Sequence, residues 1–273
     1  QGGLSQALVR AKELGCNTMQ IFSRNPQQWR QSLISSVDIQ DFIKQRKKSK
    51  ISPLFIHIPY LINLASPVPG LYRASIKAYI EDILEAGLLQ ADYIITHMGS
   101  HKDTFEAAGL SRLINALNII LKETKPSKVG ILLENTSGSG SWLGYKFSHH
   151  KAVIDGIEDK GRVGVCFDTA HAYAAGYDIA TKEGLNNTLR EIDGLFGINL
   201  IKCIHLNDSQ GKLDSRLDRH AHIAKGYIGK EGMQRIVRHP KLKKIPFILE
   251  TPKDSENADK SNLALVKKLS GEN

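Results

Sequence analysis

Seven short apolar runs recur along the chain at the spacing of strand-loop-helix units, and this recurrence constrains the fold most strongly. Each run is four to six residues long and rich in Ile, Leu, Val or Phe, without clean alternation with polar residues. Such runs are typical of strands that are buried on both faces, as in parallel sheets. They occupy residues 18–22, 54–58, 93–97, 129–134, 163–168, 201–206 and 246–250.

Helical periodicity fills the intervals between these runs. Apolar residues recur there with the spacing that places them on one side of a helix. The segments concerned are 4–14, 71–88, 110–121, 184–195 and 258–269. The runs begin about 33 to 45 residues apart, which is the length of one βα unit. Because no low-complexity linker or change in composition divides the chain, we expect residues 1–273 to form a single domain.

This order of elements predicts the α/β class and a (β/α)₈ TIM barrel. The first periodic segment is a helix that only Gln1, Gly2 and Gly3 precede, whereas a barrel helix normally follows a strand. We therefore expect seven of the eight strands, with the first strand missing from the N-terminus. The alternative is an open, doubly wound parallel sheet.

Composition narrows the functional classes. The sequence is 41% apolar and 24% charged, which is ordinary for a globular domain. It has no apolar stretch long enough for a membrane span, and no secretory signal opens it. Cys16, Cys166 and Cys203 are far apart, which argues against a disulfide framework or a thiolate zinc site and fits the cytoplasm. A net charge of +9 favours polyanions such as nucleic acid.

Six of the seven runs carry an Asp, Glu or His within one residue of their C-terminal end. On composition alone, this frequency would arise by chance well under ~1% of the time. The residues are His57, His97, Glu134, Asp168, His205 and Glu250. Barrel strands direct their C-terminal ends to one face, where active sites lie, so we expect these side chains to converge.

Two local pairs extend this set to nine candidate metal ligands. His171 lies one helical turn beyond Asp168, and Asp218 and His220 flank Arg219. Imidazoles among carboxylates favour Zn²⁺, with Mn²⁺ or Fe²⁺ as alternatives. Because four carboxylates are present, three divalent ions would leave a positive site that suits a phosphodiester anion.

Seven motifs spread over nearly the whole chain carry a family resemblance. They are HIPYLIN (57–63), HMGSH (97–101), LLENTSGSG (132–140), FDTAHAYAAGYD (167–178), HLNDSQ (205–210), DRHAHIAKGYIG (218–229) and LETP (249–252). With these motifs the sequence resembles the endonuclease IV family of apurinic/apyrimidinic endonucleases. The resemblance implies a TIM barrel with three zinc ions, one of them replaceable by Mn²⁺.

The resemblance also implies the distribution of the ligands. The three ions would be held by His57, His97 and Glu134; by Glu134, Asp168, His205 and Glu250; and by His171, Asp218 and His220. Glu134 would bridge two ions, and Glu250 would also orient or deprotonate the nucleophile. The implied reaction is hydrolysis of the phosphodiester 5′ to an abasic site in duplex DNA, which leaves a 3′-hydroxyl, together with trimming of blocked 3′ ends.

The same resemblance implies that loops after the first strands grip DNA. Tyr60 and Leu61 are the expected wedges at the flipped-out nucleotide, because a side chain that fills a base-sized gap offsets unstacking. Gln27 stands where some relatives carry Arg, and Arg24 or Arg219 is expected to take over part of the phosphate contact. We expect a monomer that acts on duplex DNA.

Two other readings remain open at this point. One is a divalent-metal sugar isomerase or epimerase on a related barrel, which would not require the group of His171, Asp218 and His220. The other is a catalytically idle protein that binds damaged DNA. Outside the set of nine, His149 and His150 follow no strand and are expected to face solvent.

Overall fold

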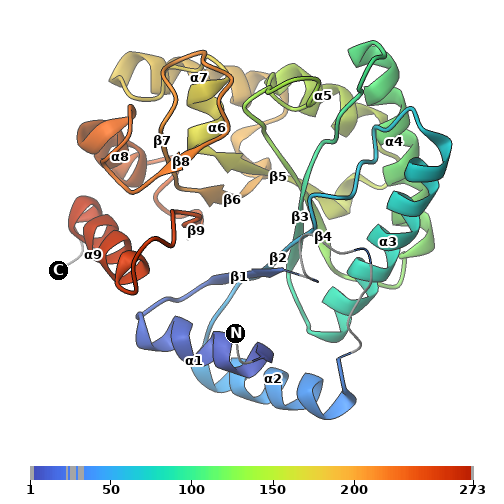
Figure 1. Ribbon diagram of the computed structural model, residues 1–273, viewed down its shortest axis with the longest axis horizontal. Helices are drawn as coiled ribbons and strands as arrows, with labels where there is room; N and C mark the ends of the chain where they lie inside the picture. Colours follow the sequence, from blue (N-terminus) through green and yellow to red (C-terminus); the bar gives the residue numbers. More distant parts are fainter. Residues whose placement is uncertain (1–2, 23, 25–28, 30–33, 272–273) are drawn as a thin grey trace.

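The computed structural model describes residues 3–22, 24, 29 and 34–271, and a curled parallel sheet forms its centre (Figure 1). Seven strands lie in the order β1-β2-β3-β4-β5-β6-β9, and every neighbouring pair is parallel. These strands are β1 Met19–Phe22, β2 Leu54–His57, β3 Tyr93–His97, β4 Gly130–Glu134, β5 Val163–Asp168, β6 Ile201–His205 and β9 Phe247–Ile248. Each coincides with one of the seven apolar runs.

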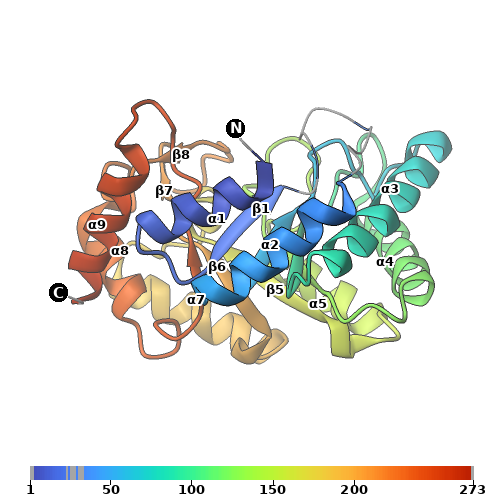
Figure 2. The ribbon, with the colours of Figure 1, turned by 90° about the horizontal axis from the view of Figure 1, so that it is seen from below.

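Helices cover the outer side of the sheet (Figures 1 and 2). They are α1 Gly3–Glu13, α2 Ser36–Ser49, α3 Pro69–Leu88, α4 Glu106–Glu123, α5 Phe147–Gly156, α6 Thr169–Ala174, α7 Lys182–Leu195, α8 Gly229–Arg238 and α9 Ala258–Ser270. Helix α4 shows how the periodicity works, because Leu113, Leu117 and Ile120 are fully buried on the side that faces the sheet. No helix among the described residues is both long and apolar enough to cross a bilayer.

The TIM barrel prediction is confirmed, and the doubly wound alternative is excluded. The sheet closes almost completely, but no ladder joins β1 to β9 within the described part of the chain. Two cavities, of about 670 and 560 Å³, lie along this interval and share Thr18 and Phe247 in their walls. The sheet is therefore interrupted between β1 and β9, where Ile248 and Glu250 line the second cavity.

The long connection between β6 and α8 folds back on itself through Asp208. This buried carboxylate accepts hydrogen bonds from the backbone N–H groups of Ser209, Gly226, Ile228 and Gly229. The short strands β7 (Asp208–Ser209) and β8 (His220–Ala221) pair antiparallel across it. The connection thereby brings residues 218–220 back over the end of β6.

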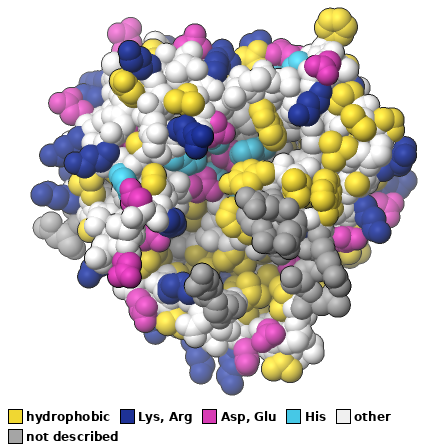
Figure 3. All heavy atoms as spheres, in the orientation of Figure 1, with side chains coloured by type: hydrophobic (Ala, Val, Ile, Leu, Met, Phe, Trp, Pro, Cys, Tyr) yellow, Lys and Arg dark blue, Asp and Glu magenta, His cyan; other side chains and the backbone are white. Residues whose placement is uncertain are grey.

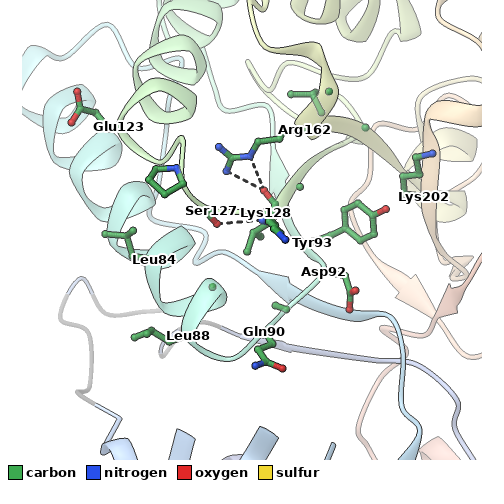
Figure 4. Close-up of a pocket in the computed structure, with 18 residues that line it drawn as sticks. Leu84, Leu88, Gln90, Asp92, Tyr93, Glu123, Ser127, Lys128, Arg162 and Lys202 are labelled. Atoms are coloured by element: carbon green, nitrogen blue, oxygen red, sulfur yellow. Dashed lines mark hydrogen bonds between the residues drawn. The ribbon is translucent and has the colours of Figure 1, made fainter. Parts of the chain in front are cut away.

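A cavity of about 880 Å³ lies at the N-terminal ends of β3, β4 and β5 (Figure 4). Arg162 there donates to the carbonyl of Val129, and the Ser127 hydroxyl accepts from the Val129 N–H. Active sites of such barrels lie at the other end, where the strands finish. This cavity is therefore separate from the candidate site.

Candidate metal centre

Alternation along the strands builds two layers of side chains inside the barrel. Successive side chains of a strand point to opposite faces, so positions i and i+2 both face the interior. The lower layer consists of Phe55, Ile95, Leu132, Cys166, Cys203 and Ile248. The upper layer, two positions further along, consists of His57, His97, Glu134, Asp168, His205 and Glu250. The six predicted strand-end residues therefore lie together, and Figure 3 shows histidine and acidic side chains at the bottom of a hollow on this face.

The side chains form three groups that share members. Within each group, the candidate ligand atoms lie within 4.8 Å of one another. The groups are His57, His97 and Glu134; Glu134, Asp168, His205 and Glu250; and Asp168, His171 and His220. Glu134 and Asp168 each belong to two groups. The ninth predicted residue, Asp218, places its Oδ1 3.0 Å from Nε2 of His171. The structure therefore brings all nine predicted residues together.

Glu134 is the centre of the cluster and is fully buried. Its Oε2 lies 3.1 Å from Nε2 of His57 and 3.2 Å from Nε2 of His97. Its Oε1 lies 2.9 Å from Nδ1 of His205 and 3.4 Å from Nδ1 of His171. Two ligands of one tetrahedral zinc ion lie about 3.4 Å apart, so the separations from His57, His97 and His205 suit atoms that share a cation.

Hydrogen bonds fix which ring nitrogen of three histidines faces the cluster. Nδ1 of His57, His171 and His220 lies 2.7, 3.0 and 3.1 Å from the backbone carbonyl of Ile58, Asn135 and Glu250, respectively. A carbonyl only accepts, so each Nδ1 carries the hydrogen, and in the neutral ring Nε2 keeps its lone pair. Metal-binding histidines are commonly oriented in this way.

The surroundings of His220 show whether the side chains of the cluster suit a bound cation. Its Nε2 is buried, has no hydrogen-bond partner among the residues that the structure describes, and lies 3.7 Å from Oδ2 of Asp168. A buried polar atom without a partner costs free energy, so a lone pair aimed at a carboxylate indicates a place for a cation. The nitrogen and oxygen donors of the cluster are those that zinc accepts.

The pKa values also indicate that the cluster favours positive charge. Burial opposes protonation of His205, but the Glu250 and Glu134 carboxylates raise its pKa well above the usual value. Burial likewise opposes protonation of His171, and Asp168 and Asp218 raise its pKa well above the usual value. The cluster thus stabilises protons at the positions where a metal cation would bind.

Three amide side chains that the sequence reasoning missed support the cluster. Gln20 donates to Oε1 of Glu250 at 2.7 Å, and its own oxygen lies 2.8 Å from Nε2 of His205. Asn207 donates to Oδ2 of Asp168 at 2.7 Å, and Asn135 accepts from the Asp168 N–H at 2.8 Å. Asn135 and Asn207 lie within two residues of strand-end ligands, which is the signal that would have found them.

Tyr60 lies over one edge of the cluster and is 54% exposed. Its ring centre is 5.9 Å from that of His57, 6.0 Å from that of His97 and 6.3 Å from that of Phe22. Leu61 beside it is partly buried. Tyr60 is thus a half-exposed aromatic ring at the rim, directly next to the first group of candidate ligands.

The other predicted DNA contacts lie in different surroundings. Arg219 is exposed, whereas Gln27 lies outside the described residues. Arg24 is buried: its Nε donates to Asp82 at 2.9 Å, and Nη1 donates to the carbonyl of Trp29 at 2.6 Å. Because its guanidinium is bound within the protein, Arg24 is held against α3 instead of facing a phosphate.

The expectation that His149 and His150 face solvent is wrong, because both rings are buried. His149 accepts from the Gly144 N–H at 3.1 Å and lies 3.4 Å from Glu106. His150 packs against Phe147 of the same helix, and burial lowers its pKa from 6.5 to about 4. Their helix α5 turns this side toward the core.

Comparison with known proteins agrees with this arrangement. A family model described as a xylose isomerase-like TIM barrel matches residues 8–269. A protein of Methanoculleus marisnigri named probable endonuclease 4 is 40% identical over 270 residues, which cover 99% of this chain and 96% of that protein. A probable endonuclease 4 of Chloroflexus aurantiacus is 41% identical over 269 residues, which cover 98% of this chain and 94% of that protein.

Among solved structures, endonuclease IV from Thermus thermophilus superimposes with a TM-score of 0.88 at 33% identity. The match covers 99% of this chain and 95% of that chain. The similarity therefore includes both the barrel and the connections that carry the candidate ligands. The chain belongs to the endonuclease IV family of metal-dependent hydrolases, built on a xylose isomerase-like TIM barrel.

Proposed function

We propose that this protein is a zinc-dependent DNA-repair endonuclease that hydrolyses the phosphodiester 5′ to an abasic site in duplex DNA. The products would be a 3′-hydroxyl and a 5′ end that carries the abasic residue, and blocked 3′ ends would be trimmed by the same site. The observation that carries the proposal is the third group, in which His171 and His220 lie with Asp168, and Asp218 lies beside them. A sugar isomerase or epimerase would not require this group.

We assign three zinc ions to the cluster, with Mn²⁺ as an alternative at one position. Zinc bound there would supply Lewis-acid activation of the phosphodiester and of water near neutral pH. The ligand sets are His57, His97 and Glu134; Glu134, Asp168, His205 and Glu250; and His171, Asp218 and His220, with Asp168 close to the last set as well. Glu134 joins the first two sets.

Glu250 is the residue that we assign to proton transfer from the attacking water. Its side chain is 22% exposed, so it reaches the hollow, whereas Glu134 is fully buried. Burial raises the pKa of Glu250, but the nearby His205 lowers it overall, so the group is a carboxylate at neutral pH. A carboxylate accepts hydrogen bonds and orients a water molecule in the manner of a general base.

The surface around the hollow supports a polyanionic substrate. Exposed cations lie on the connections that follow β6 and β9, namely Lys212, Arg219, Lys225 and Lys253. Such cations bind phosphates and release counterions, irrespective of the base sequence. We assign the wedge role to Tyr60 and Leu61, which lie beside the first set of ligands, and we retain Gln27 as a contact of the same kind.

One assay tests the proposal. A duplex with a single abasic site is incubated with the wild-type protein, with Glu134→Gln and with Glu123→Gln, which alters an exposed residue at the other end of the barrel. We expect nicking 5′ to the lesion by the wild type and by Glu123→Gln, and none by Glu134→Gln. Ketose–aldose interconversion without nicking would support the isomerase, and binding without scission would support the idle binder.

Metal content gives a second, independent measurement. We expect about three zinc ions per chain in the wild type and fewer in Glu134→Gln, because that side chain belongs to two ligand sets. One ion per chain in active wild-type protein would contradict the assignment of three.

We further propose that residues 1–273 act as one domain and as a monomer in the cytoplasm. One buried cluster runs from Leu8 to Leu269, and all nine candidate ligands come from a single chain. The three cysteines are unpaired, as is usual in a reducing compartment.

A further inference from the structure

Two cysteines that are distant in the sequence meet beneath the cluster. Cys166 on β5 and Cys203 on β6 are direct partners in the register of the sheet, and both are fully buried in the lower layer. Their sulfur atoms and a ring nitrogen of His205 all lie within 4.8 Å of one another. His205 thus takes part in both layers.

We propose that Cys166, Cys203 and His205 form a further binding site for a thiophilic divalent cation, which shares His205 with the zinc group above it, with Cd²⁺ as the probe. Two sulfurs and one imidazole are a soft donor set, unlike the carboxylate-rich cluster above them. Binding would replace the two thiol protons, which leave to solvent, by one dication. Two thiolates and one dication together carry no net charge, which suits the apolar surroundings of Leu132 and Ile248.

The interval between β1 and β9 gives such a cation a way in. The cavity of about 560 Å³ along this interval is lined by Ile248 of the lower layer and by Gln20 and Glu250. Gln20 contacts His205 directly. The cavity therefore leads to Ile248 of the lower layer, and Glu250 and His220 of the zinc groups line it as well.

Occupation of the sulfur site has a consequence that depends on the proposed function. A thiophilic ion that binds the imidazole of His205 competes with the group that contains Glu134 and Asp168. Cadmium would then inhibit nicking, and replacement of the two cysteines would relieve this inhibition. The binding itself does not depend on the nature of the reaction.

Ultraviolet absorption tests the proposal without any activity measurement. The full chain, stripped of metal and reloaded with zinc, is titrated with CdCl₂. We expect a sulfur-to-cadmium charge-transfer band that saturates at one equivalent in the wild type and in Cys16→Ser. The band should be absent in Cys166→Ser/Cys203→Ser. A band that persists in this double variant, or no band in the wild type, would overturn the site.

A second measurement covers the case in which the double variant does not fold. The cadmium-113 NMR shift of the wild-type complex should report two sulfur ligands and a nitrogen. A shift typical of oxygen and nitrogen ligands alone would contradict the proposal. Nicking is recorded separately on cadmium-free, zinc-loaded protein. Absence of the band with intact nicking by that protein refutes only the sulfur site, and absence of nicking by that protein with an intact band refutes only the proposed function.

Discussion

The side-chain oxygen of Gln20 lies 2.8 Å from Nε2 of His205, across the interval between β1 and the end of the sheet. The amide nitrogen of Gln20 donates to Glu250, so its oxygen is the acceptor and His205 Nε2 must carry a hydrogen. Nδ1, the nitrogen nearest Glu134 and Glu250, then keeps the lone pair of the neutral ring. Gln20 thereby selects the ligand nitrogen of His205.

We therefore expect Gln20→Ala to weaken metal binding by about 10- to 100-fold, the usual effect of removing a group that orients a ligand. Competition with a zinc chelator measures the change. Gln40→Ala, on the exposed side of α2, is the control and should bind zinc as the wild type does. Equal zinc affinity in the wild type and Gln20→Ala would show that His205 is oriented without Gln20.

Replacement of Arg24 by Met should destabilise the fold by about 3–5 kcal/mol, because it removes the guanidinium from a buried carboxylate. Arg24 and Asp82 are both buried, and two guanidinium nitrogens contact Asp82 Oδ1. Urea unfolding measures the loss. Lys151→Met, which breaks the exposed Lys151–Asp155 pair, is the control and should change stability little.

A double variant separates the ion pair from packing. Arg24→Met/Asp82→Leu should regain most of the stability lost in the single variant, because the buried carboxylate that faced the guanidinium is then removed as well. If the double variant is no more stable than Arg24→Met, the cost comes from lost packing of the Arg24 side chain and not from the charge.

Asn207→Ala should destabilise the protein by about 2–4 kcal/mol, because it removes the hydrogen-bond partners of two buried groups. Asn207 donates to Asp168 at 2.7 Å and accepts from the Glu250 N–H at 2.8 Å. Thermal unfolding of metal-stripped protein isolates this effect from zinc binding. Asn115→Ala, on the exposed part of α4, should leave the melting temperature nearly unchanged.

His150 should make the fold less stable as the pH falls from about 6.5 to about 4. Burial lowers its pKa to about 4 in the folded state from 6.5. Between these values the unfolded chain binds a proton that the folded chain does not, so acidification favours unfolding. The contribution to the free energy of unfolding falls by about 2 kcal/mol between pH 7 and pH 5.

The comparison with His150→Gln isolates this contribution from that of the other histidines. Urea unfolding at pH 7 and pH 5 should show a smaller loss of stability in the variant than in the wild type. Identical losses in the two proteins would mean that His150 is as easily protonated in the folded state as in the unfolded state.

The positions of the candidate ligands were predictable because they follow from two local rules. Parallel strands end at one face of a barrel, so donors at strand ends such as His97 and Glu134 must meet. Side-chain alternation then places them inside. Both rules can be applied once the apolar runs and the residues at their C-terminal ends are known, and both can be read from the sequence.

Features that depend on long-range packing were not predictable in this way. The burial of His150 depends on Phe196, which lies beyond α7 and packs against the same ring. The contact between Cys166 and Cys203 depends on a shift in register beside Val165. The ion pair of Arg24 joins residues 58 positions apart. Periodicity within one element carries no information about such distances.

The alternation of the two layers also determines which changes the strands tolerate. Deleting one residue of β5 before Cys166 would shift the rest of the strand by one position. Because side chains alternate between the two faces of the sheet, Cys166 and Asp168 would then both point out of the barrel interior. Exchanging Leu132 for another aliphatic side chain leaves Glu134 in place. A library of variants that changes the residue types of the lower layer but keeps the length of each strand should therefore contain far more folded proteins than a library that changes strand length.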